Sequence, residues 1–556
     1  KQSAVGKNHL HKIIDAPGRN FMRHKKIKGE TSLLIPLIIL MCAQIGTSAD
    51  NSVLSVATNS LISVLHASMN DIQLANMVYS LCAGAFMVAG GMLGIIIGWN
   101  QNFRIGASLI FFGELILAFS QNIIIFTWGG RLIVGLGASL MIPSVLGMIP
   151  GIYKTAKERA FAFGAVGAAT GIASAAGPIV AGILIDNFGF RVAFGFLAVY
   201  FAIIVVSSGL IPHIPKSSTK LRLDYQGIIM AACGLFLFLI GISKINVWGL
   251  ITPINAPFTI LGYSPSILLI VLGIIILGYL LKVEKYVEKK HGCALVPSSF
   301  IYNVQVREGL YASAIVFFYL GGLIMVINPY LQLVNGFNAL QTGVAMGFMG
   351  VPMFLSSLLT PKYCYQFHPK YILRIGYLLL GLAVLPMSYS LQPDGVNKLM
   401  FVGLFISGIG MGLISSQCSN IVATAINTRD AEQSGGIQTT SRNVGQAIGV
   451  AILGMVMLFT LSYGWKDSLD NTPELSSSLK DQLKHERIAF KSNSDFLHQF
   501  DKKKVSEKEK QVLVTVNSEV RMHSTQYALY TMGLISVLFI FGTTGIENNI
   551  EKDDTK

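Results

Sequence analysis

The chain has 556 residues, of which 52% are hydrophobic and only 13% are charged, and its formal net charge is +14. Soluble domains carry about a quarter charged residues, so this balance excludes an ordinary soluble protein. The apolar residues gather in about fourteen runs, and a helix needs ~20 such residues to cross a bilayer. Because backbone groups in lipid must be hydrogen-bonded within their own segment, we expect an all-α polytopic membrane protein.

The apolar runs also predict the orientation of the chain. In chain order, the predicted spans are 33–57, 74–98, 104–121, 123–150, 162–187, 192–212, 225–245, 266–282, 309–329, 342–360, 371–391, 399–420, 443–463 and 525–545. With the N-terminus in the cytoplasm, the cytoplasmic segments hold 27 Lys or Arg, whereas the short external ones hold only Arg191 and Lys398. This asymmetry is the positive-inside bias, so the basic excess orients the spans and implies no nucleic-acid partner. We expect a multi-pass protein of the inner (plasma) membrane with both termini cytoplasmic.

The predicted spans group as six, two and six. Secondary transporters commonly form a midplane site between two pseudo-symmetric halves, and this grouping favours that architecture. The expected parts are a basic cytoplasmic tail (1–32), an N-terminal six-helix half (33–212), an inserted helix pair (213–282), a cytoplasmic linker (283–308), a C-terminal six-helix half (309–546) and a cytoplasmic tail (547–556).

One long segment, 464–524, lies outside the cell in this topology. It holds eleven basic and ten acidic residues with interleaved signs, a pattern typical of a solvated surface. A cap over the outward cavity or a contact for an adaptor protein is the alternative.

Several function classes find no support in the motifs of the chain. A GxxxxGK[ST] phosphate loop is missing from the sequence, which argues against ATP-driven transport by this chain alone. All six cysteines fall in predicted spans or cytoplasmic segments (Cys42, Cys82, Cys233, Cys293, Cys364 and Cys418), so no disulfide framework is expected. We expect neither an enzyme nor a cofactor or metal site.

Ionisable residues inside the predicted spans are few, and three of them are candidate functional residues: Asp50, Glu114 and Arg131. A charge at the bilayer centre costs ~2.5–3.5 kcal/mol on insertion scales, and such residues are functional by default. We expect Asp50 to exchange protons and Arg131 to modulate its proton affinity by approaching it. A purely structural ion pair is the alternative for these two residues. Glu114 is either a packing residue or a ligand for a cationic substrate, and Tyr79 and Gln332 are further candidate substrate ligands.

The fifth predicted span is rich in small residues and contains the step Gly177-Pro178. Small residues let helix backbones approach closely, and proline removes one helical hydrogen bond and kinks the helix. We therefore expect Gly177 and Pro178 to form a hinge between access states.

Several motifs fall in a recognisable order. The residues from Arg131 to Pro143 match the span-four pattern Arg-x-x-x-Gly-x-Gly-x-x-x-x-x-Pro at every fixed position. The stretch 50–57 is similar to an acidic span-one motif, and 177–182 is similar to the Gly-Pro motif of antiporters. Three later stretches, 224–227, 329–343 and 441–449, have counterparts in the same proteins. On these residues the chain resembles the major facilitator superfamily, specifically its fourteen-helix drug:proton antiporters of the EmrB/QacA type.

The resemblance implies roles for particular residues and one departure. It assigns proton coupling to Asp50 and Arg131 and the antiport hinge to Gly177 and Pro178. The loop between spans two and three carries charges in this family, but here the stretch 91–99 keeps its glycines and loses every charge. Those charges latch the two halves together in the family, so their loss weakens the expectation of ordinary gating. Spans ten and thirteen also lack the acids that some members use, which argues against a dicationic substrate.

Three functions are therefore weighed. The leading hypothesis is the export of a small amphipathic or cationic compound in exchange for protons, by alternating access. The second is the export of one defined metabolite, such as a siderophore or fatty acid, with a periplasmic adaptor as partner. The third, from another class, is a membrane sensor or scaffold that transports nothing. Retaining Asp50 and Arg131 in apolar spans is hard to explain by scaffolding.

Overall fold

The structure is a computed structural model. It describes residues 18–67, 69–215, 225–253, 256–291, 296, 298–364, 366–426, 434–485, 490, 493–498 and 505–546. Fourteen of the helices in these ranges are long and apolar enough to cross a bilayer. The prediction of an all-α membrane protein with fourteen spans is therefore confirmed. The first part of the basic tail, Asp224, Cys293 and the tail 547–556 lie outside the described residues.

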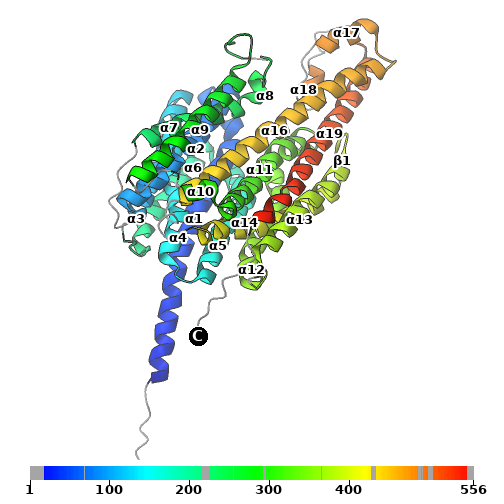
Figure 1. The fold of residues 1–556 in the computed structure, drawn as a ribbon. Coiled ribbons are helices and arrows are strands. Elements are labelled where there is room, and N and C mark those ends of the chain that lie inside the picture. Colours follow the sequence, from blue (N-terminus) through cyan, green and yellow to red (C-terminus); the bar gives the residue numbers. More distant parts are fainter. Residues whose placement is uncertain are drawn as a thin grey trace, which may run out of the picture.

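The first group of spanning helices packs around one hydrophobic core (Figure 1). Buried side chains such as Phe103, Phe163 and Phe201 come from different helices of this group and share that core. The members are α1 (Gly18–Leu65), α2 (Met69–Ile97), α3 (Trp99–Phe119), η1 with α4 (Ile125–Arg131 and Leu132–Ile152), α5 (Ala156–Phe188) and α6 (Phe190–Ser207), followed by η2 (Ser208–Leu210).

The inserted helices α7 (Tyr225–Ser243) and α9 (Pro265–His291) pack against each other, and α7 also packs on α2. Their contact is close, because a Cβ atom on Gly273 would lie 2.7 Å from the backbone nitrogen of Phe238. Such glycine contacts are typical of helix association in lipid, where van der Waals packing replaces the hydrophobic effect. The short helices α8 (Ile245–Trp248) and α10 (Ser298–Tyr302) lie next to this pair in sequence.

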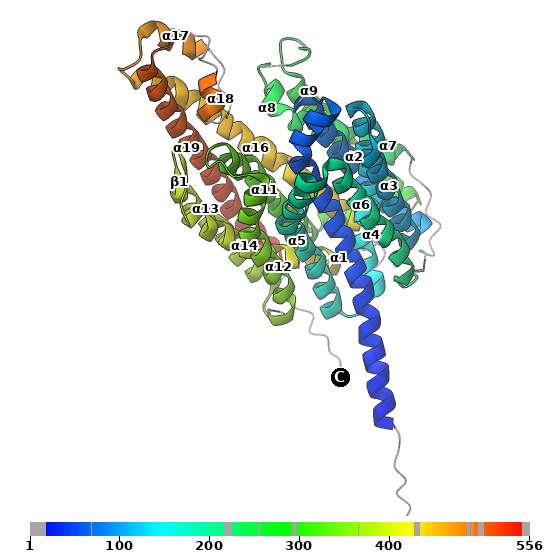
Figure 2. The ribbon, with the colours of Figure 1, turned by 180° about the vertical axis from the view of Figure 1, so that it is seen from behind.

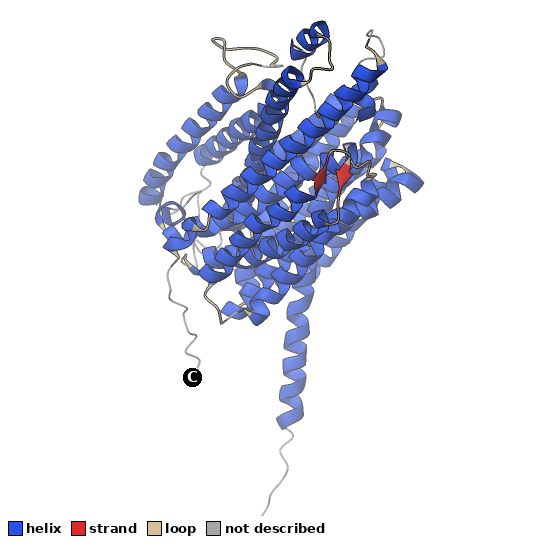
Figure 3. Cartoon of the chain, turned by 90° about the vertical axis from the view of Figure 1, so that its right-hand side faces the viewer, coloured by secondary structure: helices blue, strands red, loops and turns tan. Residues whose placement is uncertain are grey.

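The last six spanning helices pack around a second hydrophobic core, which contains Tyr319, Tyr377 and Leu453. A two-stranded antiparallel hairpin pairs Leu391 with Val396 and follows directly on the end of α13 (Figure 3). The elements are α11 (Val304–Leu333), α12 (Ala339–Tyr363), α13 (Pro369–Ser390), β1 (Leu391–Gln392), β2 (Gly395–Val396), α14 (Leu399–Thr424), α16 (Ser434–Asn471), α19 (Glu507–Leu538) and η3 (Phe541–Gly545).

The segment 464–524, which the sequence predicts to be external, is largely built from continuations of two spanning helices. Helix α16 runs on to Asn471 and α19 already begins at Glu507, so the predicted start of the last span at 525 is late by about five turns of helix. The short helices α17 (Ser477–His485) and α18 (Asn493–His498) lie between them. A separate hydrophobic core, including Trp465 and Leu513, holds these four helices together.

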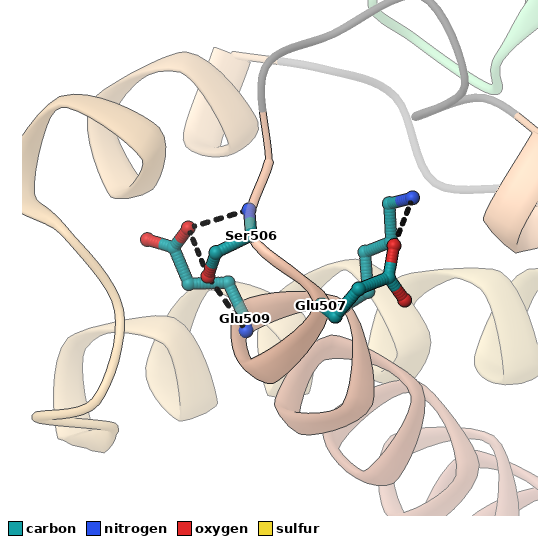
Figure 4. A network of polar contacts seen from close by, with 4 residues as sticks. Ser506, Glu507 and Glu509 are labelled. Carbon is teal, nitrogen blue, oxygen red and sulfur yellow. Dashed lines mark hydrogen bonds and ion pairs between the residues drawn. The ribbon is translucent and has the colours of Figure 1, made fainter.

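The start of α19 is fixed by a capping box. Ser506 Oγ accepts a hydrogen bond from the backbone N–H of Glu509, and the carboxylate of Glu509 accepts one from the backbone N–H of Ser506 (Figure 4). One turn further, Lys510 Nζ contacts Glu507 Oε1 at 2.8 Å. The two hydrogen bonds of the capping box satisfy backbone N–H groups that have no partner inside the helix. They therefore stabilise a helix start that lies outside the apolar run.

The two groups of helices meet closely where α16 begins. A Cβ atom on Gly91 of α2 would lie 3.0 Å from Gly436 Cα, and one on Gly435 would lie 2.5 Å from the carbonyl oxygen of Pro143 on α4. Toward the opposite end, α17 and the far ends of α16 and α19 lie apart from α8 and α9 (Figure 2). The described residues thus bring α2 and α4 into direct backbone contact with α16 at the end that the sequence assigns to the cytoplasm.

The start of α1 and the end of α19 lie at one end of the bundle, and α17 and α18 lie at the other (Figure 1). The side of the membrane that each end of the bundle faces stays a prediction. The exact domain boundaries assigned from the sequence stay a prediction.

Candidate functional site

Arg131 stands at the end of a π-helical turn. The turn covers Ile125–Arg131 and leads directly into α4. A π turn is uncommon and often marks a functional site, because the extra residue rotates the side chains that follow it. Here the side chain of Arg131 has no exposed surface. The local irregularity therefore delivers a guanidinium group into the interior of the first helix group.

Asp50 from α1 meets Arg131 in that interior. Arg131 Nη1 donates to Asp50 Oδ1 at 2.6 Å and to Oδ2 at 2.8 Å. The exposed fraction of the two side chains is 0% for Arg131 and 1% for Asp50. Removing one member of such a buried pair leaves an uncompensated charge and typically costs about 3–5 kcal/mol. The predicted pairing of the span-one acid with the span-four arginine is present in this geometry.

Tyr79 from α2 covers the guanidinium group. Its ring centroid lies 4.5 Å from Arg131 Cζ, which is the geometry of a cation–π contact. Helix α2 can come this near because a Cβ atom on Gly135 would lie 2.8 Å from the carbonyl oxygen of Tyr79. Tyr79, a candidate substrate ligand from sequence, thus forms one wall of the arginine site.

Glu114 from α3 is the third ionisable group of this cluster. Its exposed fraction is 0%, and it lies near enough to Asp50 and Arg131 for the charges of both to act on it. Neither of its oxygens accepts a hydrogen bond from a donor in the described residues. The neighbouring Gly113 fits tightly against α4, since a Cβ atom there would lie 2.9 Å from the backbone nitrogen of Val134.

The other two predicted features lie elsewhere. Gly177 and Pro178 stand within α5, which continues through the proline. The contact with α12 is tight there, because a Cβ atom on Gly343 would lie 3.0 Å from Pro178 Cβ. Gln332 is exposed and is the penultimate residue of α11, in the other helix group. The structure therefore gathers Asp50, Arg131, Tyr79 and Glu114, but does not bring Gln332 to them.

Sequence reasoning missed the polar clamp beside the uncharged loop. Asn102 Nδ2 donates to Gly90 O, Leu140 O and Ser144 Oγ, at 2.9–3.0 Å, and so ties α3 to α2 and α4. Trp99 fills the space between Gly94 and Gly147, because a Cβ atom on either glycine would overlap the indole ring. An asparagine and a tryptophan at the start of an apolar run were the available signal.

A second buried arginine lies in the other helix group. Arg442 of α16 donates from Nε to Ser313 Oγ and from Nη2 to Ser419 Oγ, both at 3.1 Å. Its guanidinium carbon lies 5.5 Å from the centroid of the Phe317 ring. In the described part of the chain, these two hydrogen bonds of Arg442 go to neutral hydroxyls. This site therefore differs in kind from the acid-paired site of Arg131.

The chain is similar in sequence and in fold to known membrane proteins. The family model "Major Facilitator Superfamily" matches residues 40–450. The chain is 27% identical over 446 residues to a probable actinorhodin transporter of Streptomyces coelicolor, covering 78% of this chain and 74% of that protein. It is 25% identical over 440 residues to a tetracenomycin C resistance and export protein of Streptomyces glaucescens, covering 77% and 75%.

A multidrug resistance protein, Stp, of Mycobacterium tuberculosis is 23% identical over 390 residues and covers 69% of this chain and 68% of its own length. Among solved structures, that of the human organic anion transporter MFSD10 (TETRAN) has a TM-score of 0.57 at 11% identity, covering 92% of this chain and 98% of that one. This last likeness concerns the fold alone. The family match spans most of the chain, and the fourteen spans agree with it, so the protein belongs to the Major Facilitator Superfamily, a family of membrane transporters.

Proposed function

We propose that the protein exports small amphipathic or cationic compounds in exchange for protons, by alternating access, as a multidrug efflux transporter. The relatives named above are antibiotic and multidrug exporters of the same superfamily. The observation that carries the proposal is the ion pair of Asp50 and Arg131, which is sealed from solvent in a bilayer-spanning bundle. A buried charge pair of this kind is costly to keep and is retained at ion and proton pathways of transporters.

Under this proposal, protonation of Asp50 and separation from Arg131 are one event. A neutral Asp50 attracts Arg131 much less than a carboxylate does, because the Coulomb term vanishes with the charge. The helices α1 and α4 then lose the contact that holds them in the present arrangement. Gly177 and Pro178 in α5 would serve as the hinge that lets the two helix groups rock, since a proline leaves one helical hydrogen bond unmade.

Substrate recognition is proposed for Glu114, Tyr79 and Gln332. Glu114 has no exposed surface in this conformation, so a cationic compound reaches it only after the helices around it move apart. Tyr79 offers an aromatic face, which suits a lipophilic cation. We place the protein in the inner (plasma) membrane with both termini cytoplasmic, and we infer that it is not an enzyme.

The test uses the full-length protein in proteoliposomes with an imposed pH gradient. Release or uptake of cationic dyes, antibiotics, siderophores and fatty acids is measured for wild type and for Asp50→Asn. Gradient-driven transport of at least one compound by wild type, reduced tenfold or more in Asp50→Asn, is the expected result. An exposed acid changed in the same way, Asp186→Asn, serves as the control. Equal gradient dependence in wild type and Asp50→Asn would sink the proposal.

The export of one defined compound is the second candidate, and a specific observation favours it. Two of the relatives are named for a single compound each, actinorhodin and tetracenomycin C. The four-helix external unit around Trp465 and Leu513 also offers a folded surface for a periplasmic adaptor. Transport of one chemical class only in the same screen, together with an adaptor that copurifies with the protein, would favour this candidate over broad efflux.

A further inference from the structure

The buried cluster around Arg131 leaves matching hydrogen-bonding groups unused. Arg131 donates to Asp50 from Nη1 alone, and its Nε and Nη2 have no hydrogen-bond partner among the described residues. Both oxygens of Glu114 are likewise buried and accept no hydrogen bond from a described donor. Unused donors and unused acceptors thus share one site that no solvent reaches. Glu114 is therefore placed as an alternative partner for Arg131.

The charges of this cluster do not balance without a proton. One base and two acids carry a net charge of −1 when all three are ionised, and a lone charge without solvent is expensive. One proton makes the site neutral. Asp50 and Glu114 also lie near enough for their charges to interact, and two neighbouring acids repel each other when both are ionised. Since Arg131 holds Asp50, the proton belongs on Glu114 in this conformation.

The charges that act on Glu114 are those of Asp50 on α1 and Arg131 on η1. Further titratable groups lie on α6 and α2, which also pack against α3. From α6, Arg191 donates to the carbonyl oxygen of Ser120 and Tyr200 donates to that of Cys42. From α2, the ring of Tyr79 lies on Arg131, and the remaining titratable groups of that helix are Asp71 and Cys82.

We propose that Glu114 is the second acid of a proton-exchange site in which Arg131 alternates between two carboxylates. In the present arrangement Arg131 pairs with Asp50, and Glu114 carries the proton. When the guanidinium group turns to Glu114, its carboxyl proton passes to Asp50, so the site keeps one proton and stays neutral. A monocationic substrate then binds beside Asp50, which Arg131 no longer holds. The charge of the substrate takes the place of the proton's charge, and Asp50 releases its proton to water.

This inference rests on the proposed proton-coupled export, because it names the proton that is exchanged. The test reads that proton by infrared spectroscopy, since a protonated carboxylic acid has a C=O stretch that a carboxylate lacks. Full-length protein in lipid nanodiscs at neutral pH is measured as wild type, Glu114→Gln and Asp50→Asn. Labelling the side-chain carboxyl of glutamate with ¹³C in wild type shifts the C=O band of a protonated Glu. The band of a protonated Asp stays in place. Glu284→Gln is the control, because Glu284 of α9 is also fully buried.

We expect a protonated-glutamate band in wild type that is lost in Glu114→Gln and kept in Glu284→Gln. Asp50→Asn is also expected to lose it, because Arg131 then pairs with Glu114 and ionises it. A band that survives Glu114→Gln would overturn the assignment. A band that survives Asp50→Asn would overturn the exchange of Arg131 between the two acids. If Glu114→Gln fails to fold, labelled wild type and labelled Glu284→Gln still test the proposal. A ¹³C-shifted band that is missing from wild type, or that is lost in Glu284→Gln, would contradict it.

The two proposals fail separately. A pH-gradient-driven transporter whose neutral-pH spectrum lacks the glutamic-acid band would overturn this inference and leave proton-coupled export standing. A protein with the band but without any gradient-driven transport would overturn the proposed function alone.

Discussion

Two ion pairs of this protein have nearly the same length and opposite surroundings. Arg131 Nη1 lies 2.6 Å from Asp50 Oδ1, and Lys510 Nζ lies 2.8 Å from Glu507 Oε1. The exposed fractions are 0% and 1% for the first pair, and 21% and 83% for the second. Exposed pairs are worth about 0–1 kcal/mol because water and salt screen them, whereas removing one partner of a buried pair costs about 3–5 kcal/mol. Environment, and not distance, decides what an ion pair does here.

The same difference separates the roles of the two regions. In the four-helix unit around Trp465 and Leu513, solvent-exposed charges such as that of Glu507 can be lost one at a time at little cost. In the bundle, each change of charge must be matched by another, and this requirement is what can couple a proton to a movement of helices. We therefore expect substitutions in the buried cluster to reduce stability most and substitutions at exposed charges to reduce it least.

The largest effect is expected for Arg131→Met, which leaves Asp50 and Glu114 in the interior without a cation. We expect a loss of about 3–5 kcal/mol in stability, seen as a lower melting temperature of the purified protein in detergent. The matched variant is Arg442→Met, which removes a buried arginine whose described hydrogen-bond partners are the neutral hydroxyls of Ser313 and Ser419. This variant loses two hydrogen bonds but leaves no buried acid behind, so we expect a loss of about 1–3 kcal/mol in stability.

Equal melting temperatures of the two variants would contradict this ordering. That result would mean that solvent enters the site of Arg131 in detergent and screens the acids. Measurement in nanodiscs, where the bundle is laterally enclosed by lipid, then separates the effect of the detergent from a property of the protein.

A smaller effect is expected where the two helix groups touch without any charge. A Cβ atom on Gly435 would lie 2.5 Å from the carbonyl oxygen of Pro143, so Gly435→Ala forces α16 away from α4. Overpacking of this kind typically costs about 1–3 kcal/mol, which is roughly a tenfold change in population per 1.4 kcal/mol. We expect a larger population with separated ends of α4 and α16, read as a longer spin-label distance in nanodiscs.

Gly182→Ala is the control for this experiment, because a Cβ atom on Gly182 would meet nothing within 4 Å. An unchanged distance distribution in Gly435→Ala would show that the closure does not depend on the glycine contact. A shift in both variants would point to a general effect of alanine in these helices.

Most of what the sequence predicts correctly depends on the length of its apolar runs and on the free-energy cost of burying a charge. The fourteen spans follow from apolar runs, because lipid demands about twenty apolar residues per helix. The pair of Asp50 and Arg131 was predictable for a related reason, since two opposite charges in neighbouring apolar spans lower their cost by meeting. The family resemblance is confirmed by the family match over residues 40–450.

What sequence reasoning missed depends on contacts between distant residues. The extension of α16 to Asn471 and the early start of α19 are stabilised by a core that includes Trp465 and Leu513, and hydropathy windows do not register so small an apolar stripe. The π turn before Arg131 has no simple sequence signature. The close backbone contact between Gly91 and Gly436 joins residues that are far apart in the sequence, so only the packed helices reveal it.

The smallest effects are expected in the external unit, at the start of α19. Ser506→Ala removes the capping hydroxyl that accepts from the backbone N–H of Glu509, and loss of such a cap costs about 1 kcal/mol. Glu507→Gln removes only the exposed pair with Lys510 and should cost about 0.5 kcal/mol or less. Hydrogen exchange of the first amides of α19 measures both, with faster exchange in Ser506→Ala and near wild-type exchange in Glu507→Gln. High salt should abolish the small effect of Glu507→Gln and leave that of Ser506→Ala. A salt-resistant loss in Glu507→Gln as large as that in Ser506→Ala would show that the exposed pair is stronger than its surroundings allow, and the contrast with Arg131 and Asp50 would fail.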